Sequence, residues 1–333
     1  MDLEEFKQKF ENKPVVEEPN SVTQNPLVSV CVQSYQHAKY IKECLDGILM
    51  QETNFEYEIL LGEDASTDGT REICIHYAEK YPDKIRLFLH HRENNIAIEG
   101  SPTGRFIFMT NLLTARGEYI ALCEGDDYWT DPYKLQKQVD FLESNPSYII
   151  HSGKAQVLKD NNLVKETYST LESKTYDIKG FYTVNKVYTC TVMFRNISRS
   201  TFEFEFKLFG DWISYISLLS NKPGNLAYVS NEVYAVYRVH SGGAMQRVSQ
   251  LYKNAEAQIT HIYAINKFIK CEYSEKDIQR INDYCLVIFS HYLNISEYKK
   301  CINIFYKNIE LVKYHISVKG YLSLLFRKII PKS

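Results

Sequence analysis

Residues 26–51 read PLVSVCVQSYQHAKYIKECLDGILMQ, and this stretch decides the class of fold. Its β-branched apolar run at 27–35 is typical of a buried strand. At 39–51 the apolar side chains recur at the spacing of one helix face. A buried strand followed by an amphipathic helix is the repeating unit of an α/β sheet.

The same unit recurs three more times before residue 150. We predict strands at 57–64, 85–91 and 118–127, and helices at 70–81, 106–116 and 131–146. We also expect Thr70 to cap the second helix and Pro132 to lie in the first turn of the fourth. The alternation predicts an open, mostly parallel, Rossmann-like sheet over 26–150, which binds ligands beyond the carboxyl ends of its strands.

After residue 150 the pattern becomes irregular, which indicates a mixed extension of the same sheet up to residue 247. Further strands are predicted at 148–158, 187–195 and 226–240, and a short helix at 211–220. From residue 248 to 333 the pattern is helical, with a capping arrangement at Ser274. Residues 1–25 are polar, carry two prolines, and are predicted to form a tail or a loosely docked arm.

The overall composition is that of a folded globular protein. Of the 333 residues, 44% are hydrophobic and 24% are charged. The 39 Lys and Arg nearly balance the 41 Asp and Glu, and the net charge of -2 argues against a nucleic-acid partner. Any anionic ligand must therefore be held by a local site.

The cysteines and the chain ends favour the cytoplasm. The eight cysteines include no C-x-x-C pair, and the acidic amino terminus lacks the apolar core of a signal peptide. No run approaches the ~18 apolar residues that span a bilayer. The last segment, 311–333, contains five Lys or Arg and no acid. Its pattern predicts either an interfacial helix on an anionic membrane surface or a basic helix packed on the protein.

Polar residues follow three of the first four strands, at the edge where ligands bind. Gln33-Ser34-Tyr35 ends the first strand, Glu63-Asp64 the second and Glu124-Gly125-Asp126-Asp127 the fourth. Carboxylates in E-x-D spacing repel one another unless a cation or a proton offsets them. We therefore predict an Mn2+ or Mg2+ site at Glu124 and Asp126; the alternative is an acidic turn that caps the next helix.

The phosphates of a nucleotide are the expected partner of such a metal ion. The sequence has no P-loop and no G-x-G-x-x-G turn, so the metal would have to hold them. Tyr35 could then stack on the base, and Asp64 could accept a hydrogen bond from a base N–H. Each has an alternative role, Tyr35 in the core and Asp64 in capping a turn.

These blocks together resemble the nucleotide-binding half of family 2 glycosyltransferases, which have the GT-A fold. The likeness extends over residues 27–150. It implies an open mixed sheet with a C-terminal helical extension, and inverting transfer of a sugar from a nucleoside diphosphate to an acceptor bound by residues 151–247. By this resemblance Ser34, Tyr35, Asp64, Glu124 and Gly125 contact the nucleotide and Asp126 binds metal. Glu124 stands where the family has the first Asp of D-x-D.

Inverting transfer requires one base, because the leaving diphosphate is handled by the metal. Asp211 follows Gly210 at the start of an apolar helix and is the best-placed candidate, with a plain helix cap as the alternative. The run Tyr-Arg-x-His-x-Gly at 237–242 resembles the family segment that closes over the nucleotide. By that resemblance Arg238 contacts phosphate and His240 binds metal, although a lone His is more often structural.

The leading hypothesis is a metal-dependent inverting glycosyltransferase of cell-surface polysaccharide assembly, which acts on a glycan or a lipid-linked acceptor. The protein would be cytoplasmic, at the inner face of the cell membrane if its basic end binds lipid. A sugar-phosphate nucleotidyltransferase is the alternative enzyme, but 33–40 lacks the glycine-rich basic loop of that class. A non-catalytic nucleotide-sugar-binding protein is the third hypothesis.

Overall fold

The computed structural model describes residues 2–98, 101–159, 162–164, 172–197, 210–240 and 251–329. It divides into two compact units. The first comprises residues 1–176 and 186–239, and the second comprises 177–185 and 240–333. The predicted boundary at 247 lies outside the described residues, and the change of unit falls between Val239 and His240.

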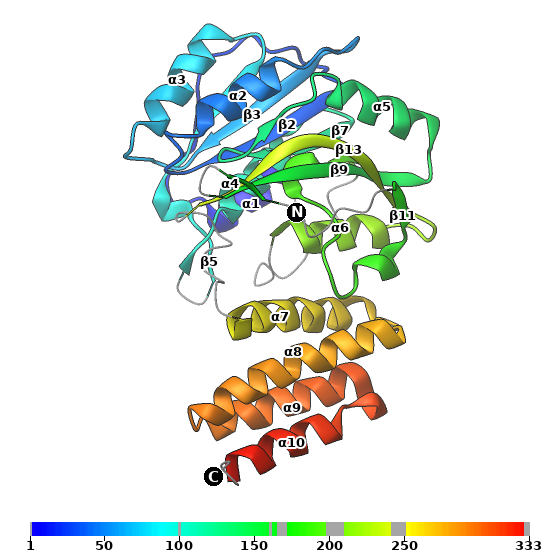
Figure 1. Cartoon of the computed structure of the whole chain (residues 1–333). Coiled ribbons are helices and arrows are strands. Elements are labelled where there is room, and N and C mark those ends of the chain that lie inside the picture. The colour runs from blue at the N-terminus through cyan, green and yellow to red at the C-terminus, as the bar shows by residue number, and fades with distance from the viewer. Residues whose placement is uncertain are drawn as a thin grey trace. The chain divides into compact units, whose positions relative to one another are not determined.

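The first unit is built on a mixed sheet of 11 strands among the described residues (Figure 1). Its order is β1-β4-β3-β2-β7-β12-β9-β13-β11, with β10 beside β9 and β8 beside β13. The strands are β1 (Val16–Glu17), β2 (Val28–Ser34), β3 (Tyr57–Glu63), β4 (Ile85–Leu89), β7 (Tyr119–Glu124), β8 (Tyr128–Trp129), β9 (Tyr148–Lys159), β10 (Asn162–Val164), β11 (Lys174–Tyr176), β12 (Met193–Arg195) and β13 (Leu226–Val239). A separate pair joins β5 (Ala97–Ile98) to β6 (Ser101–Pro102).

Helices cover both faces of this sheet. They are α1 (Leu3–Phe10), α2 (Ile41–Leu49), α3 (Thr70–Lys80), α4 (Arg105–Thr114), α5 (Lys134–Ser144) and α6 (Gly210–Ser220). Figure 1 shows α2 and α3 on one face and α4 on the other. This is the result that right-handed crossovers require, because the chain steps outward from β2 to β4 and then returns to the opposite side of β2. The predicted α/β alternation is confirmed.

The strand order creates a topological switch point between β2 and β7. The chain leaves β2 toward β3 and β4, whereas β7 pairs with the other edge of β2. β2, β3, β4 and β7 all run parallel, so their carboxyl ends share one edge. Open α/β sheets bind ligands at such a crevice. This geometry places the candidate site.

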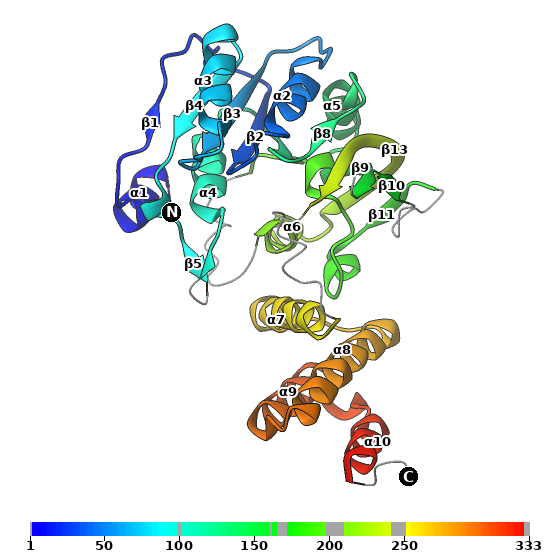
Figure 2. The ribbon, with the colours of Figure 1, turned by 60° about the vertical axis from the view of Figure 1, so that its left-hand side comes forward.

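Residues 2–25 form an arm docked on the first unit, which is one of the two alternatives predicted for the amino terminus. Phe6 is fully buried and stacks on Phe106 of α4 with 5.2 Å between ring centroids. β1 pairs antiparallel with β4, and Figure 2 shows β1 beside β4. Phe6 and Phe10 lie one turn apart in α1, but a helix of eight residues is too short for periodicity to decide between a tail and a docked arm.

Three local predictions are also corrected. The residue before α3 is Gly69 with φ of 101°, and Thr70 is the first helical residue rather than the cap. Pro132 precedes α5, whose first residue is Lys134. The strand predicted at 187–195 is a 3-10 turn, η3 (Thr189–Thr191), followed by the short β12. Tight 3-10 turns leave no periodic apolar pattern, so this turn could not be predicted.

The second unit is helical, as predicted from residue 248 onward. It contains the turns η2 (Ile178–Phe181) and η6 (Lys313–His315), and the helices α7 (Leu251–Ile269), α8 (Glu275–Asn294), α9 (Tyr298–Val312) and α10 (Val318–Ile329). The capping box predicted at Ser274 is present, with Asp277 as its partner. Among the described residues, no helix is long and apolar enough to cross a membrane.

Candidate active site

The core of the site lies where β2 and β7 end side by side. Gln33 pairs with Glu124 in the register of these strands, and the Gly125 N–H donates to the Gln33 carbonyl over 2.9 Å. A Cβ atom on Gly125 would lie 3.0 Å from Oγ of Ser34 and 2.8 Å from Nδ1 of His37. Only glycine therefore lets the acidic loop approach the end of β2 this closely.

The acidic loop, residues 124–127, carries more negative charge than its surroundings offset. Burial raises the pKa of Glu124 well above its usual range, and the charges of Asp127, Asp126 and Asp211 raise it further. Its Oε2 is buried without a hydrogen-bond partner. Asp127 is also buried, but it accepts the Arg238 backbone N–H over 2.8 Å. The loop does not cap α5, whose N-cap residue is Tyr133 and which has no side-chain cap hydrogen bond.

Asp211 comes to this loop from the far part of the chain. It is the second residue of α6, and its charge is one of those that raise the pKa of Glu124. Its Oδ2 accepts a 2.5 Å hydrogen bond from the Thr189 hydroxyl, and its Oδ1 accepts the Trp212 N–H over 2.7 Å. The fold therefore brings the predicted base and the predicted metal-binding loop together across 87 residues of sequence.

The residues of the acidic loop fit a divalent cation. Within the described ranges, no three His, Cys, Asp or Glu side chains are arranged to hold a metal by themselves. Mg2+ in nucleotide sites usually has only one or two carboxylate ligands, and phosphates and water complete its coordination. Glu124, with its unpartnered buried oxygen, and Asp126 beside it supply those carboxylates. A cation there would also offset the charge that raises the pKa of Glu124.

A second part of the site lies at the ends of β2 and β3. The Asp64 carboxylate is buried, pairs with Arg92, and accepts a 2.8 Å hydrogen bond from the Asn95 amide. The guanidinium carbon of Arg92 also lies 3.8 Å from the centroid of the Tyr35 ring. Tyr35 is 40% exposed, so its ring is available to a ligand rather than enclosed in the core. Burial raises the pKa of Asp64, while Asn95 and Arg92 act in the opposite direction.

The sequence did not single out Arg92, Asn95 or Thr189. Arg92 and Asn95 follow β4, which carries no acidic cluster to draw attention to its end. The loops after β2 and β3 are also joined by Gln36, whose backbone N–H donates to Ser66 over 3.0 Å. Gln36 has a φ of 56°, and such strain is typical of functional loops.

Arg238 and His240 lie at the end of β13. Arg238 donates to the Asp126 carbonyl over 2.8 Å, pairs with Glu43, and stacks over the Tyr128 ring at 4.5 Å. In this arrangement it holds the acidic loop in place, and its contact with phosphate stays a prediction. His240 is the first residue of the second unit, and its role as a metal ligand also stays a prediction.

The comparison with known proteins agrees with this geometry. The model of "Glycosyl transferase family 2" matches residues 29–203, more than half of the chain. The chain belongs to glycosyl transferase family 2. The matched range contains the ends of β2, β3 and β7, and Thr189 as well.

Two relatives of this family 2 chain are an uncharacterized mycobacterial protein and a glucosyltransferase. The chain is 34% identical to uncharacterized protein Rv1520 of Mycobacterium tuberculosis over 223 residues, which are 65% of this chain and 60% of that protein. The chain thus spans about 60% of the length of that relative. It is 25% identical to the Escherichia coli UDP-Glc:alpha-D-GlcNAc-diphosphoundecaprenol beta-1,3-glucosyltransferase WfaP, over 75% of this chain and 98% of WfaP.

The fold is shared with TarS of S. aureus, solved in complex with UDP-GlcNAc. That structure, of TarS residues 1–349, superposes with a TM-score of 0.60 at 19% identity, over 91% of this chain and 87% of the solved one. The GT-A sheet with a helical C-terminal region is therefore confirmed as the fold of this family 2 chain.

Proposed function

We propose that this protein is a metal-dependent, inverting glycosyltransferase of cell-surface polysaccharide assembly. It moves a sugar from a nucleoside diphosphate to a hydroxyl group of a glycan or lipid-linked acceptor. The observation that carries the proposal is the meeting of Asp211 with the acidic loop at the carboxyl ends of β2 and β7. An inverting transfer needs one base, and Asp211 supplies a carboxylate close to the acidic loop.

The proposed roles fall into two parts of the site, one that binds the base of the nucleotide and one that binds the metal ion. Tyr35 and Asp64 hold the base of the nucleotide, with Arg92 and Asn95 fixing the Asp64 carboxylate. Glu124 and Asp126 hold Mn2+ or Mg2+, which would neutralise charge on the departing diphosphate. Ser34 and Gly125 lie between the two parts, where the absence of a side chain on Gly125 lets the acidic loop pack against Ser34, and both are proposed to contact the nucleotide.

Asp211 is proposed as the catalytic base. It takes the proton of the acceptor hydroxyl as that oxygen bonds to the anomeric carbon and the bond to the diphosphate breaks on the opposite face. The Thr189 hydroxyl and the Trp212 N–H each occupy one carboxylate oxygen, so the side chain is held in a single orientation. A held base needs no reorganisation when the acceptor arrives.

The acceptor and the location are proposed from the relatives and the sequence. WfaP is named for transfer to a diphosphoundecaprenol-linked sugar, and it is covered almost completely by this chain. A lipid-linked acceptor at the inner face of the cell membrane is therefore the first to test. The basic segment 311–333 is consistent with an anionic membrane surface as a further partner.

The decisive experiment replaces Asp211 with Asn. Release of the nucleoside diphosphate is followed, UDP from UDP-glucose and UDP-GlcNAc and GDP from GDP-mannose, with extracted lipid-linked glycans as acceptors. Nucleotide affinity is measured by calorimetry with Mn2+. We expect a loss of about 10²-fold or more in turnover with unchanged nucleotide affinity. Asp140→Asn, at an exposed position of α5, is the matched control. Full turnover in the Asp211 variant would exclude Asp211 as the catalytic base. Release of pyrophosphate from a nucleoside triphosphate would favour a nucleotidyltransferase.

A further inference from the structure

The outer side of α9 carries a stripe of apolar side chains that the fold leaves uncovered. Tyr298, Ile302, Tyr306 and Ile309 are all exposed, Tyr306 by 64%. At about 100° per residue these positions fall within roughly one quarter of the helix circumference. The opposite side of α9, with Cys301, Ile304 and Leu311, is buried within the second unit. α9 therefore has apolar side chains on two opposite sides, one buried in the second unit and the other exposed.

The next helix, α10, repeats this arrangement. Val318, Leu322, Leu325 and Phe326 are exposed, Phe326 by 59%. Tyr321 anchors the helix, because it is buried against Phe289 of α8 and Phe305 of α9 with ring centroids 4.8 and 4.9 Å away. Its hydroxyl accepts a 2.9 Å hydrogen bond from the Asn308 amide. The α9 and α10 stripes therefore belong to neighbouring helices of one packed unit.

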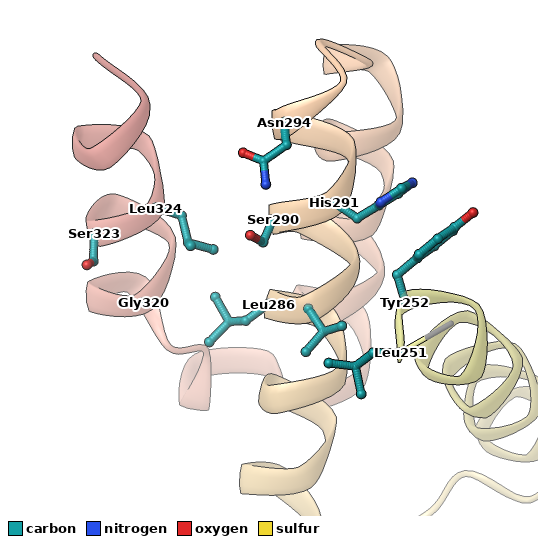
Figure 3. Close-up of a pocket in the computed structure, with 10 residues that line it drawn as sticks. Leu251, Tyr252, Leu286, Ser290, His291, Asn294, Gly320, Ser323 and Leu324 are labelled. Atoms are coloured by element: carbon teal, nitrogen blue, oxygen red, sulfur yellow. The ribbon is translucent and has the colours of Figure 1, made fainter. Parts of the chain in front are cut away.

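Part of α10 borders a groove rather than packing tightly on the other helices. A groove of about 540 Å³ lies between α7, α8 and α10, and Figure 3 shows Leu324 and Leu286 facing each other across it. A Cβ atom on Gly320 would lie 2.7 Å from Leu286, so α10 approaches α8 closely at this glycine. Leu322, Leu325 and Phe326 of α10 are exposed, so packing within the second unit does not explain why these positions are apolar.

The charges on the helices that carry the two stripes are mostly positive. Residues 295–329 include seven Lys or Arg and only two acids, Glu297 and Glu310. Lys299 and Lys300 are exposed at the start of α9, Lys313 is exposed in the η6 turn, and Lys319 is exposed at the start of α10. The apolar stripes thus lie on helices with an excess of positive charge, so a partner that is both apolar and anionic complements them.

We propose that the α9 and α10 stripes together form a docking surface for a membrane that contains anionic lipids. A bilayer offers acyl chains to the apolar side chains and phosphate headgroups to the lysines. Tyr298 and Tyr306 suit the headgroup region, where their rings and hydroxyls are both accommodated. A second copy of this chain fits less well, because a two-fold contact would place one cationic face against another. The proposal extends the membrane role of 311–333 to a preformed surface that includes α9.

The test is cosedimentation of the full chain with vesicles, without donor or acceptor. Vesicles of equal parts phosphatidylglycerol and phosphatidylcholine are compared with pure phosphatidylcholine. One variant combines Ile302→Ser with Tyr306→Ser, and another combines Leu322→Ser with Phe326→Ser. The control combines Leu163→Ser with Val164→Ser, which removes two exposed apolar side chains from β10 in the first unit. Melting curves verify that each variant is folded.

We expect the wild type and the control to bind the anionic vesicles, and each stripe variant to bind about tenfold more weakly. Binding should fall as salt is added, because the lysine contribution is screened. Equal binding by the stripe variants, or equal binding to pure phosphatidylcholine, would overturn the proposal. A stripe variant that turns a dimer into a monomer, with no vesicle binding by the wild type, would assign the surface to a second copy. Since no sugar is transferred in this assay, its outcome is independent of the proposed catalytic roles.

Discussion

The Thr189 hydroxyl donates a 2.5 Å hydrogen bond to Oδ2 of Asp211, which fixes the proposed base from a neighbouring turn. Thr189 opens η3, and the next residue, Cys190, is buried and accepts the Trp129 indole N–H through its carbonyl over 2.7 Å. Trp129 in turn follows the acidic loop in sequence. A short chain of contacts thus links the base to the carboxylates that it must work beside, and Thr189 is a positioning residue within it.

Replacing Thr189 with Val should lower kcat by about tenfold, since a hydrogen bond to a charged group contributes about 1.5 kcal/mol. Nucleotide affinity should not change, because Thr189 is not among the proposed ligands. Thr189→Ser keeps the hydroxyl and should retain most of the turnover. Steady-state kinetics and calorimetry separate the two effects. A loss in the Ser variant as large as that in the Val variant would contradict the prediction, because the hydroxyl alone would then not preserve turnover.

Replacing Glu124 with Gln should raise thermal stability while it removes activity. The carboxylate is buried near three other acids, so the neutral amide relieves repulsion in the absence of metal. A gain of about 1 kcal/mol corresponds to roughly 2–4 °C in Tm for a unit of this size. Mn2+ with UDP should raise the Tm of the wild type and not that of the variant. Differential scanning fluorimetry with and without EDTA checks both, and a variant that still responds to Mn2+ would exclude Glu124 as a ligand.

The strand ends that form the site could be predicted, whereas the side chains that support them could not. A buried strand followed by acids is a local pattern, so Asp64, Glu124 and Asp126 were visible in the sequence. Arg92 reaches Asp64 from 28 residues away, and Thr189 reaches Asp211 from a turn that had the composition of a strand. Such contacts depend on the strand order, which propensity does not specify. Phe6 was missed for the same reason, because its partner Phe106 lies 100 residues away.

Replacing Tyr35 with Ala should weaken UDP binding by about tenfold, because stacking on an aromatic ring contributes about 1–3 kcal/mol. Tyr35→Phe should bind normally, since the ring supplies the contact and also remains under Arg92. Tyr133→Ala, at an exposed tyrosine before α5, controls for the loss of a surface ring. Calorimetry with UDP gives the affinities. If the Ala variant binds UDP as well as the wild type, the base of the nucleotide does not stack on Tyr35.

Replacing Lys134 with Met should change how stability depends on pH. Lys134 is fully buried, donates to Gln138 over 2.8 Å and lies 3.9 Å from the Trp129 ring centroid. Burial lowers its pKa to about 7, although Cys123, Cys190 and Asp131 act in the opposite direction. The unfolded chain keeps this proton up to about pH 10, so between these limits the unfolded state binds more protons. The free energy of unfolding should therefore rise with pH in the wild type, by up to about 1.4 kcal/mol per unit, relative to the variant.

Urea denaturation at several values between pH 7 and pH 9 measures this difference. The advantage of the Met variant should be greatest at the lowest pH and should shrink as the pH rises. Lys80→Met, at an exposed position of α3, should follow the wild type throughout. Parallel curves for the wild type and the Lys134 variant would show that the buried amine keeps its proton in the folded protein.

Replacing Phe6 with Ala tests whether the amino-terminal arm is part of the fold. The side chain is fully buried between Phe10 and Phe106, each 5.2 Å away between ring centroids, and loss of a buried phenylalanine costs about 3–5 kcal/mol. We expect a fall of several degrees in Tm and earlier proteolysis of residues 2–25. Val16→Ser, at an exposed position of β1, should change neither. An unchanged Tm in the Phe6 variant would mean that the arm contributes nothing to the stability of the sheet it lies against, and residues 2–25 would then be a tail after all.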